Sequence, residues 1–271
     1  MNLENLGPVV LVGAGKMGTA LARGWLAAGL QPANVVFVDP QPSDPIRAFA
    51  EEQGIALSES VPEKPARALI MAVKPQIFAQ VMESVKPRIG AETLVLSIAA
   101  GISLESISNG LGTERVVRTM PNTPSQVGKG MTGAVAASGV NEEDRDIADA
   151  LLSAAGKFMW FDDESELDAL TSVSGSGPAY VFLLVECLAA AGEAEGLSPE
   201  KAMVLARQTV IGAAALMDAD PTDAATLRKN VTSPNGVTAE ALAVFMADDG
   251  LEPLVKRAVN AARRKSEEIG K

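Results

Sequence analysis

The stretch Val9-Val10-Leu11-Val12-Gly13-Ala14-Gly15-Lys16-Met17-Gly18 decides the fold of this 271-residue chain. Its short β-branched run predicts a buried strand, and a GxGxxG pattern follows at once. Apolar residues at i, i+3 and i+4 spacing then predict an amphipathic helix over 16–29. Such glycines allow a tight turn and close backbone approach to a pyrophosphate, whose charge the helix N-terminus favours. The alternative is a glycine-rich turn that binds no ligand.

The same alternation of strand and helix continues to about residue 160. Further apolar runs predict strands at 34–38, 68–73, 93–98, 115–119 and 132–137. They are apolar on both faces, as in a buried parallel sheet. Helical patterns lie between them at 43–53, 76–86 and 142–155. We therefore predict an α/β Rossmann domain over residues 1–162, with a doubly wound parallel sheet that binds a dinucleotide.

Residues 163–271 predict an all-α domain. Helical patterns occupy 164–173, 178–195, 199–218, 223–230, 237–248 and 251–269. The segment 179–191 is apolar almost all round, so that helix must be buried on every side, and we expect its Cys187 to be a buried, inert thiol. A second copy of the chain would provide that burial. The sequence thus favours a homo-oligomer, at least a dimer, with the C-terminal helices at the interface.

Composition excludes several kinds of chemistry. The chain has no histidine, which rules out Ser-His-Asp and Cys-His catalysis and His-ligated metals, and we expect no metal site. The single cysteine allows no internal disulfide and indicates a reducing compartment, the cytoplasm. A net charge of −11 argues against nucleic acid and anionic membranes as partners. The longest charge-free run, 169–185, contains Ser, Thr, Gly and Pro and predicts no membrane span.

Asp39 ends the second predicted strand, 21 residues beyond Gly18. A carboxylate in this place accepts hydrogen bonds from the adenosine ribose hydroxyls and repels a 2′-phosphate, so it favours NADH. The segment 40–46 offers no Lys or Arg for such a phosphate, and Arg47 is the first cation after it. The alternative is an aspartate that only starts the turn before Pro40.

Two further groups follow predicted strands, at the sheet edge where ligands bind in this fold. They are Val73, Lys74 and Pro75, and Ala99, Ala100 and Gly101. The lysine could reach a cofactor phosphate or ribose, and the small residues would let a dinucleotide lie close. Alternatively, Lys74 is a solvated helix-start residue and the second group is strand-end packing. The proline-flanked segment 120–124 is either a rigid cofactor wall or a stiff loop.

Two polar segments begin helices in the C-terminal half. One runs over 172–178 with Ser174 and Gly175, and the other over 232–238. Each gathers hydroxyls and free amides at a helix N-terminus, which suits an anion without any arginine, although ordinary capping is the alternative. Together with a dinucleotide they predict a pocket for a small carboxylate. The acidic clusters 142–144 and 162–164 are interpreted as solvated residues that complement helix dipoles.

In order and separation, the motifs GAGKMG, AVKPQ, SIAAGIS, RTMPNTP, SGSGPAY and NVTSPNGVT resemble those of pyrroline-5-carboxylate reductases, from about Val9 to Thr238. The resemblance implies a Rossmann domain and a helical domain that forms an interlocked dimer, often assembled into decamers. It also implies hydride transfer from NAD(P)H to the C=N carbon of L-1-pyrroline-5-carboxylate, which yields L-proline in the last step of proline biosynthesis.

Carried onto this chain, the resemblance implies roles for individual residues. Pyrophosphate would lie on the glycine loop, Ser233 and Thr238 would act in catalysis, with Thr238 bonded to the ring nitrogen, and Asn230 would approach the nicotinamide. The implied substrate contacts are Gly236, Val237, Thr238, Ser174 and Gly175. The implied cofactor contacts are Gly13, Ala14, Gly15, Lys16, Met17, Gly18, Asp39, Val73, Lys74, Pro75, Ala99, Ala100, Gly101 and Asn230.

The chain departs from the family pattern in three places. Asn235 stands where members usually have glycine, and Asn tolerates positive φ better than most residues. Residues 220–223 replace an acidic residue and a His-Pro pair. Many members prefer NADPH, whereas Asp39 predicts dual or NADH-leaning use. Whether Arg118 or Lys129 contacts a ligand stays open. The alternatives are another imine or β-hydroxyacid reductase on the same two-domain plan, and a non-enzymatic dinucleotide sensor. The hydroxyacid members are disfavoured, because 178–180 holds no lysine and the next one is Lys201.

Overall fold

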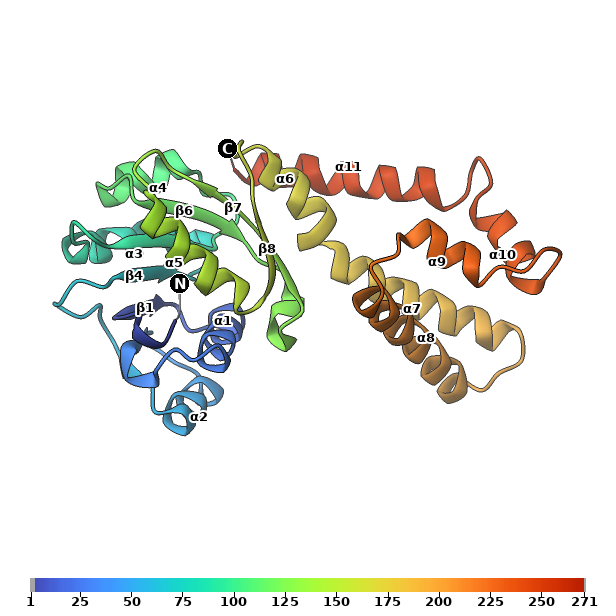
Figure 1. The fold of residues 1–271 in the computed structure, drawn as a ribbon, viewed down its shortest axis with the longest axis horizontal. Coiled ribbons are helices and arrows are strands. Elements are labelled where there is room, and N and C mark those ends of the chain that lie inside the picture. Colours follow the sequence, from blue (N-terminus) through green and yellow to red (C-terminus); the bar gives the residue numbers. More distant parts are fainter. Residues whose placement is uncertain (1–2, 271) are drawn as a thin grey trace. The chain divides into compact units, whose positions relative to one another are not determined.

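The computed structural model describes residues 3–270 (Figure 1). It consists of two compact units. One runs to Gly175 and includes the C-terminal segment from Ala262, and the other is Ser176–Ala261. The change from sheet to helices was predicted at 162/163. The last strand of the described residues ends at Trp160, but the first unit extends further because the helix Glu166–Leu170 packs on the sheet.

The first unit is built on one sheet with the strand order β3-β2-β1-β4-β5-β6-β7-β8. The strands are β1 Val9–Val12, β2 Val35–Val38, β3 Ala56–Ser58, β4 Ala68–Met71, β5 Leu94–Ser97, β6 Val116–Met120, β7 Gly130–Ala136 and β8 Gly156–Trp160. All neighbours from β3 to β6 are parallel, β7 runs antiparallel to β6, and β8 is parallel to β7. The order reverses at β1, as in a doubly wound sheet.

The parallel, two-sided sheet is confirmed, with two corrections. The strand predicted at 132–137 is antiparallel to its neighbour, because only the 3₁₀ helix η4 (Thr123–Val127) connects it to β6 and a parallel return needs a longer crossover. The edge strands β3 and β8 were not predicted. Both carry exposed residues and lack the continuous apolar run of a buried strand, since β3 has three residues and β8 alternates in burial.

Helices cover both faces of this sheet. They are α1 Lys16–Ala27, α2 Asp44–Gln53, α3 Pro75–Val85, α4 Leu104–Leu111, α5 Glu142–Ser153 and α6 Glu166–Leu170. Alternate strand residues enter two cores: Val9 and Leu11 pack with α1, α2 and α5, while Val10 and Val12 pack with α3 and α4. This two-sided burial explains why the strands are apolar throughout. Helix α4 was not predicted because it has only eight residues.

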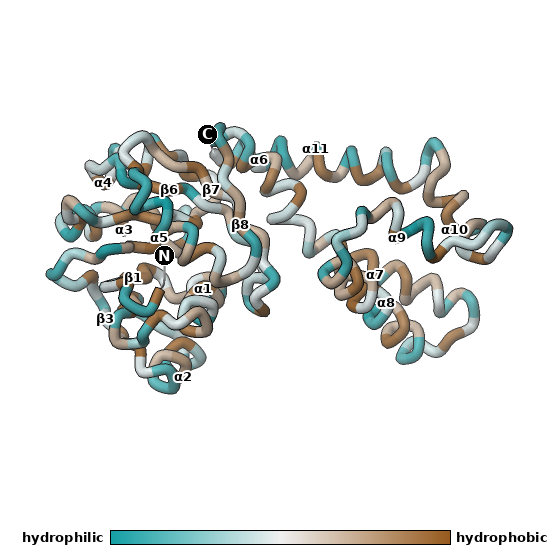
Figure 2. The backbone as a smooth tube through the Cα atoms, viewed as in Figure 1, coloured by the Kyte–Doolittle hydropathy of each residue, from teal (hydrophilic) through white to brown (hydrophobic). Residues whose placement is uncertain are grey.

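The second unit is helical throughout its described residues. It contains α7 Gly177–Ala194, α8 Pro199–Ala219, α9 Ala224–Asn230, α10 Val237–Phe245 and the first part of α11 Leu251–Ile269. Its buried cluster consists of Ala189, Ala202 and Ala206 with Val185 beside them. Large apolar side chains remain outside this cluster: Phe182 is 62% exposed and Val204 is 65% exposed. Brown, hydrophobic stretches accordingly run along α7 and α8 (Figure 2).

Two sequence predictions about α7 are wrong for the single chain. The helix is not buried on every side, and the thiol of Cys187 is exposed. Two helical segments, Glu166–Ala194 and Pro199–Ala219, are long and apolar enough to cross a membrane by length and composition. The prediction that 169–185 is no span rested on its Ser, Thr, Gly and Pro residues. Part of that stretch is a π-helix, Thr171–Gly175.

Candidate functional site

The loop after β1 gives each of its three glycines a different task. Gly13 has φ +91°, and a Cβ there would lie 2.8 Å from the carbonyl oxygen of Ala72. Gly15 faces open space, with no atom within 4 Å of a Cβ position. At Gly18 a Cβ would lie 2.7 Å from the Gly13 oxygen. The loop therefore has a tight turn, an open backbone surface and a close strand–helix contact, as dinucleotide pyrophosphate binding requires.

Helix α1 begins at Lys16 directly after this open glycine. Its N-cap, Gly15, has no side chain to satisfy the first amides, so these N–H groups remain available to an anion. Among the other residues of the loop, Ala14 is buried, Lys16 is exposed and Met17 is half-buried. Ala14 is fixed from α1, because Thr19 donates its hydroxyl hydrogen to the Ala14 carbonyl at 2.9 Å.

Asp39 leaves β2 at the same edge of the sheet. Its Oδ1 accepts a hydrogen bond from the backbone N–H of Gln41 at 3.0 Å, which is the turn-starting role that the sequence left as an alternative. The half-buried carboxylate remains available to a ribose hydroxyl through Oδ2. Both interpretations of Asp39 thus fit one geometry.

A cavity of about 470 Å³ adjoins the glycine loop, and it adds Arg23, which the sequence did not indicate, to Lys16, an implied cofactor contact. Lys16 and Arg23 of α1 line it opposite Ser43, which starts α2. The Arg23 guanidinium lies 4.2 Å from the centre of the Phe49 ring, a cation–π contact. The prediction about a cation for a 2′-phosphate rested on the segment after Asp39, where Arg47 is the first cation, and so did not include Arg23. The helical spacing of Lys16, Thr19 and Arg23 was the signal that could have extended it.

The two groups that follow β4 and β5 lie where they were predicted. The Val73 side chain packs at Gly13, since a Cβ on Gly13 would lie 2.8 Å from Val73 Cγ1. Lys74 is the exposed N-cap of α3 and Pro75 is its first residue. Ala99 is buried, Ala100 is exposed, and Gly101 has φ +74°. Because the parallel strands β1, β2, β4 and β5 end at one edge, these residues and the glycine loop share that edge.

Asn122 is a functional candidate in the segment 120–124, which the sequence left as either a rigid cofactor wall or a stiff loop. This buried side chain donates from Nδ2 to the carbonyl oxygen and the hydroxyl of Ser174, at 3.0 and 3.1 Å. Its Oδ1 accepts from the N–H of Met131 at 2.9 Å. Asn122 thus fixes the π-helix that holds Ser174 and Gly175 beside the end of β6. Its place directly after a strand was the available signal.

The acidic clusters at 142–144 and 162–164 are not simply solvated, which corrects the sequence interpretation. Asp144 is fully buried and accepts from Arg67 Nη1 at 3.2 Å and from Arg115 Nη2 at 2.7 Å. Burial lowers the pKa of Arg115, but hydrogen bonds and charge attraction from Asp144 and Glu92 outweigh it and raise that pKa. Asn141 completes a capping box at α5.

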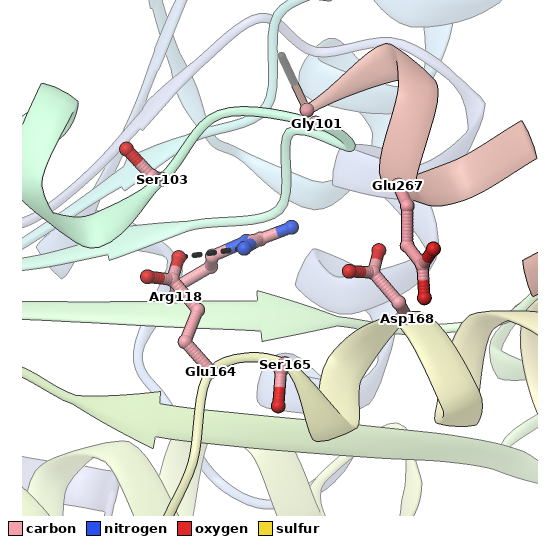
Figure 3. Close-up of a pocket in the computed structure, with 8 residues that line it drawn as sticks. Gly101, Ser103, Arg118, Glu164, Ser165, Asp168 and Glu267 are labelled. Atoms are coloured by element: carbon pink, nitrogen blue, oxygen red, sulfur yellow. Dashed lines mark hydrogen bonds and ion pairs between the residues drawn. The ribbon is translucent and has the colours of Figure 1, made fainter. Parts of the chain in front are cut away.

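Glu164 holds Arg118, the residue whose ligand role the sequence left open. Its Oε1 accepts from Arg118 Nη1 at 2.6 Å (Figure 3). The same oxygen accepts from the N–H of Leu104 at 2.8 Å. Arg118 is thereby engaged within the protein, beside a cavity of about 330 Å³ that Asp168 and Glu267 also line. Asp163 caps the same turn, and hydrogen bonds from Ser165 lower its pKa.

The second polar helix start lies in the second unit, at α10. Asn235 has φ +57°, so asparagine does occupy the left-handed turn where family members usually have glycine. At the N-cap, Gly236, no side chain caps the helix, and an added Cβ would clash with Ser233 Oγ. Val237 is 90% exposed, and Thr238 and Ser233 are also exposed. The first amides of α10 are therefore open to an anion.

Asn230 is the last residue of α9 and is exposed. The segment before this helix, 220–223, uses its acids locally. Asp220 Oδ1 accepts from the N–H of Thr222 at 2.9 Å, and Asp223 Oδ1 caps α9 by accepting from the N–H of Thr226 at 3.0 Å. These hydrogen bonds lower the pKa of both carboxyl groups. The roles of Asn230, Ser233, Gly236, Val237 and Thr238 remain predictions.

Comparison with known proteins decides the family. The chain is 42% identical to a pyrroline-5-carboxylate reductase of Pseudomonas aeruginosa over 264 residues, 96% of each protein. It is 36% identical to that of Arabidopsis thaliana, covering 96% of this chain and 94% of the relative. The chain belongs to the pyrroline-5-carboxylate reductase family. The resemblance drawn from the motifs is thereby confirmed.

Solved structures of the family share the whole architecture. A pyrroline-5-carboxylate reductase from Coxiella burnetii superposes with a TM-score of 0.90 at 33% identity, covering 98% of this chain and 100% of the other. The Plasmodium falciparum pyrroline carboxylate reductase, solved with NADP bound, gives a TM-score of 0.83 at 29% identity, with 99% and 100% coverage. The predicted class, a Rossmann domain followed by an all-α domain, is confirmed.

Two family models match separate parts of the chain. Residues 8–101 match a model described as NADP oxidoreductase, coenzyme F420-dependent, and residues 164–269 match pyrroline-5-carboxylate reductase dimerisation. The second match covers the exposed apolar helices α7 and α8, so membership of this reductase family accounts for their surface by homo-oligomerisation.

Proposed function

We propose that this chain reduces L-1-pyrroline-5-carboxylate to L-proline, taking a hydride from NAD(P)H onto the C=N carbon. The observation that carries the proposal is the full-length, 42% identity to a curated pyrroline-5-carboxylate reductase. The glycine loop supports it with the geometry of a dinucleotide site, and the uncapped start of α10 supports it with an anion site in a chain that has no histidine.

The dinucleotide would be held along one edge of the sheet. We assign its pyrophosphate to the amides of 13–18, its adenosine ribose to Asp39, and its further length to Val73–Pro75 and Ala99–Gly101. Asn230 would meet the nicotinamide end. When bound, the reduced nicotinamide supplies the hydride. The protein supplies an open backbone surface at Gly15, a helix N-terminus for the phosphates, and small side chains that permit a close approach.

We assign the substrate carboxylate to the free amides of Val237 and Thr238 at the start of α10, together with Ser233. Ser174 and Gly175 are the further substrate contacts that the resemblance implies. Helix amides and the helix dipole stabilise a carboxylate without arginine. We assign the Thr238 hydroxyl to hydrogen-bond the ring nitrogen, where it would hold or pass on the proton, and Ser233 to assist it. A protonated imine is already a strong electrophile, so positioning provides much of the catalysis.

The cofactor preference follows from two opposing features. Asp39 favours the ribose hydroxyls of NADH, whereas Lys16 and Arg23 place positive charge in the adjoining cavity, where a 2′-phosphate could be stabilised. We infer that the enzyme uses both cofactors and that Asp39 shifts its preference toward NADH. The NADP in the Plasmodium falciparum structure supports NADPH as the second cofactor.

We infer a homodimer, or a higher assembly of dimers, formed through the C-terminal helices. The dimerisation family model over 164–269 and the exposed apolar residues of α7 and α8 support it. A second copy, rather than lipid, would then cover the two membrane-length helices. The single cysteine supports a cytoplasmic location, and the net charge of −11 supports the absence of nucleic-acid and membrane partners.

The test is to incubate the purified protein with L-1-pyrroline-5-carboxylate and either reduced dinucleotide, following nicotinamide absorbance and the proline formed. The proposal expects one proline per dinucleotide oxidised. A protein that binds dinucleotide but oxidises none would instead be the sensor. Turnover of β-hydroxyacids or other imines, but not of pyrroline-5-carboxylate, would indicate the other reductase alternatives.

A further inference from the structure

The C-terminal end of the chain packs against the loop assigned to the cofactor. A Cβ on Gly101 would lie 2.6 Å from Ile269 Cγ2 and 3.0 Å from the Ile269 carbonyl oxygen. Figure 3 shows the last turn of α11 above Gly101. Two features therefore require glycine at position 101. Its φ is +74°, and the last turn of α11 occupies the space that a side chain would need.

A second contact fixes the same turn to a different element. Ser266 Oγ donates to Asp168 Oδ1 of α6 at 2.6 Å, within a part-buried setting. The α6 region is itself tied to the sheet and to α4, because Glu164 accepts from Arg118 and from the N–H of Leu104. We call residues 266–270 the C-terminal clasp. It contacts two residues that line the cavity shown in Figure 3, Gly101 and Asp168.

The hydrogen bonds that hold the loop before Gly101 are made by Ile98 and Ala99. Ile98 donates to the Met71 carbonyl at 3.1 Å, and the N–H of Ala99 reaches Ser97 Oγ at 3.3 Å. Within the described residues, the N–H groups of Ala100 and Gly101 donate no backbone hydrogen bond. Hydrogen bonds thus anchor the loop at Ile98 and Ala99, and the clasp contacts it at Gly101.

We propose that the C-terminal clasp is a positioning element for the cofactor: Ile269 and Ser266 hold the Ala99–Gly101 loop in the conformation that binds the dinucleotide. This inference rests on the proposed function, because it takes the loop to line the cofactor. The clasp residues touch no reacting atom. Their loss should weaken dinucleotide binding and raise KM for the cofactor, while kcat at saturating cofactor stays close to that of the native chain.

The test compares NADPH and NADH dissociation constants, measured by fluorescence without substrate, with kcat and KM. A chain ending at Lys265 should bind dinucleotide about tenfold more weakly, which corresponds to about 1.4 kcal/mol. Ser266→Ala should weaken binding about threefold, and Ser266→Thr, which keeps a hydroxyl donor, should restore it. Arg264→Ala, an exposed neighbour, serves as the control.

Gly101→Ala supplies an independent arm with a matched partner. Gly54 has φ +71° and no atom within 4 Å of a Cβ position, so Gly54→Ala carries the same backbone strain without touching the clasp. Only Gly101→Ala should weaken dinucleotide binding, and its effect should shrink in a chain ending at Glu268, which lacks Ile269. Unchanged dinucleotide affinity in the chain ending at Lys265, or a Gly101→Ala effect that does not shrink, overturns the clasp. Native protein that binds dinucleotide but fails to reduce the imine overturns only the proposed reaction.

Discussion

Two apolar stretches of this chain, β1 and α7, differ in how far the single subunit buries them. The strand Val9–Val12 is at most 4% exposed at every residue, because helices cover both faces of its sheet. In α7, Ala189 is buried, whereas the side chains of Phe182 and Leu183 are 62% and 58% exposed. An apolar run therefore states that burial is needed, but not whether the same subunit provides it.

The comparison also separates two ways of building a site. The Rossmann unit forms its ligand-facing edge from strand ends that its own core holds in place. The helical unit presents Ser233 in an exposed loop and Thr238 in the exposed first turn of α10, and its helices α7 and α8 carry exposed apolar side chains. We expect the first to withstand loss of the partner subunit and the second to depend on it.

The largest effect on activity is expected from placing a charge on the exposed face of α7. Phe182→Asp should break the dimer, because burying an unpaired carboxylate in an apolar interface is very costly. We expect activity to fall by about 100-fold or more, equivalent to about 2.7 kcal/mol. Size-exclusion chromatography with light scattering would detect the monomer. The matched control is Met159→Asp, at a side chain 46% exposed on edge strand β8. Equal loss in both variants would contradict the assignment of the interface to α7.

Within the Rossmann unit, Asp144→Ala should be the most damaging change to stability. It leaves Arg67 and Arg115 without their shared buried carboxylate and removes the capping box of α5. We expect a loss of about 3–5 kcal/mol in the free energy of unfolding, measured by urea denaturation. Asp149→Ala, which removes only the hydrogen bond from the Trp160 indole, should cost about 1 kcal/mol. Comparable losses would show that the buried network contributes little.

Thr238→Ala tests the chemistry of the helical unit. Without the hydroxyl, the ring nitrogen loses its hydrogen-bond partner, so kcat should fall by about 10- to 100-fold while the cofactor dissociation constant changes little. Thr238→Ser keeps the hydroxyl and should retain most of the rate. Full turnover by the alanine variant would remove Thr238 from the mechanism.

Cofactor choice should respond to the two opposing features beside the glycine loop. Arg23→Ala should raise KM for NADPH about three- to tenfold with little change for NADH, since it removes a cation from the cavity. Asp39→Asn should shift preference the opposite way by a similar factor. A strong NADPH preference in the native enzyme, unaltered by Asp39→Asn, would refute the role given to this carboxylate.

The smallest effect is a pH dependence at α9. Capping hydrogen bonds lower the pKa of Asp223 and Asp220 below the usual value in the folded state. Their stabilisation is therefore complete above the unfolded pKa and is lost as pH falls through the folded one. Asp223→Asn should remove part of the acid-induced fall in unfolding temperature between about pH 5 and pH 2. Identical pH profiles for variant and native protein would exclude this contribution.

Most of the fold could be predicted from the sequence, because continuous β-branched runs and helical periodicity reflect two-sided burial and amphipathic packing. β3 and β8 could not, since edge strands lack that signal. The glycine loop and the strand-end residues were located by motif and strand order. Arg23 and Asn122 were missed because three-dimensional packing brings them to the site from a helix face and from a turn. The paired acids Asp144 and Glu164 were misjudged, since their arginine partners are distant in sequence.

The most direct test of the account uses reduced dinucleotide carrying deuterium at the transferable nicotinamide position. The account predicts that the native enzyme, given L-1-pyrroline-5-carboxylate, forms L-proline with one deuterium on the ring carbon that is bonded to nitrogen and bears no carboxylate. Mass spectrometry and NMR of the product would locate the label. Proline without deuterium at that carbon, or no proline at all, would contradict the assignment of this chain as a pyrroline-5-carboxylate reductase.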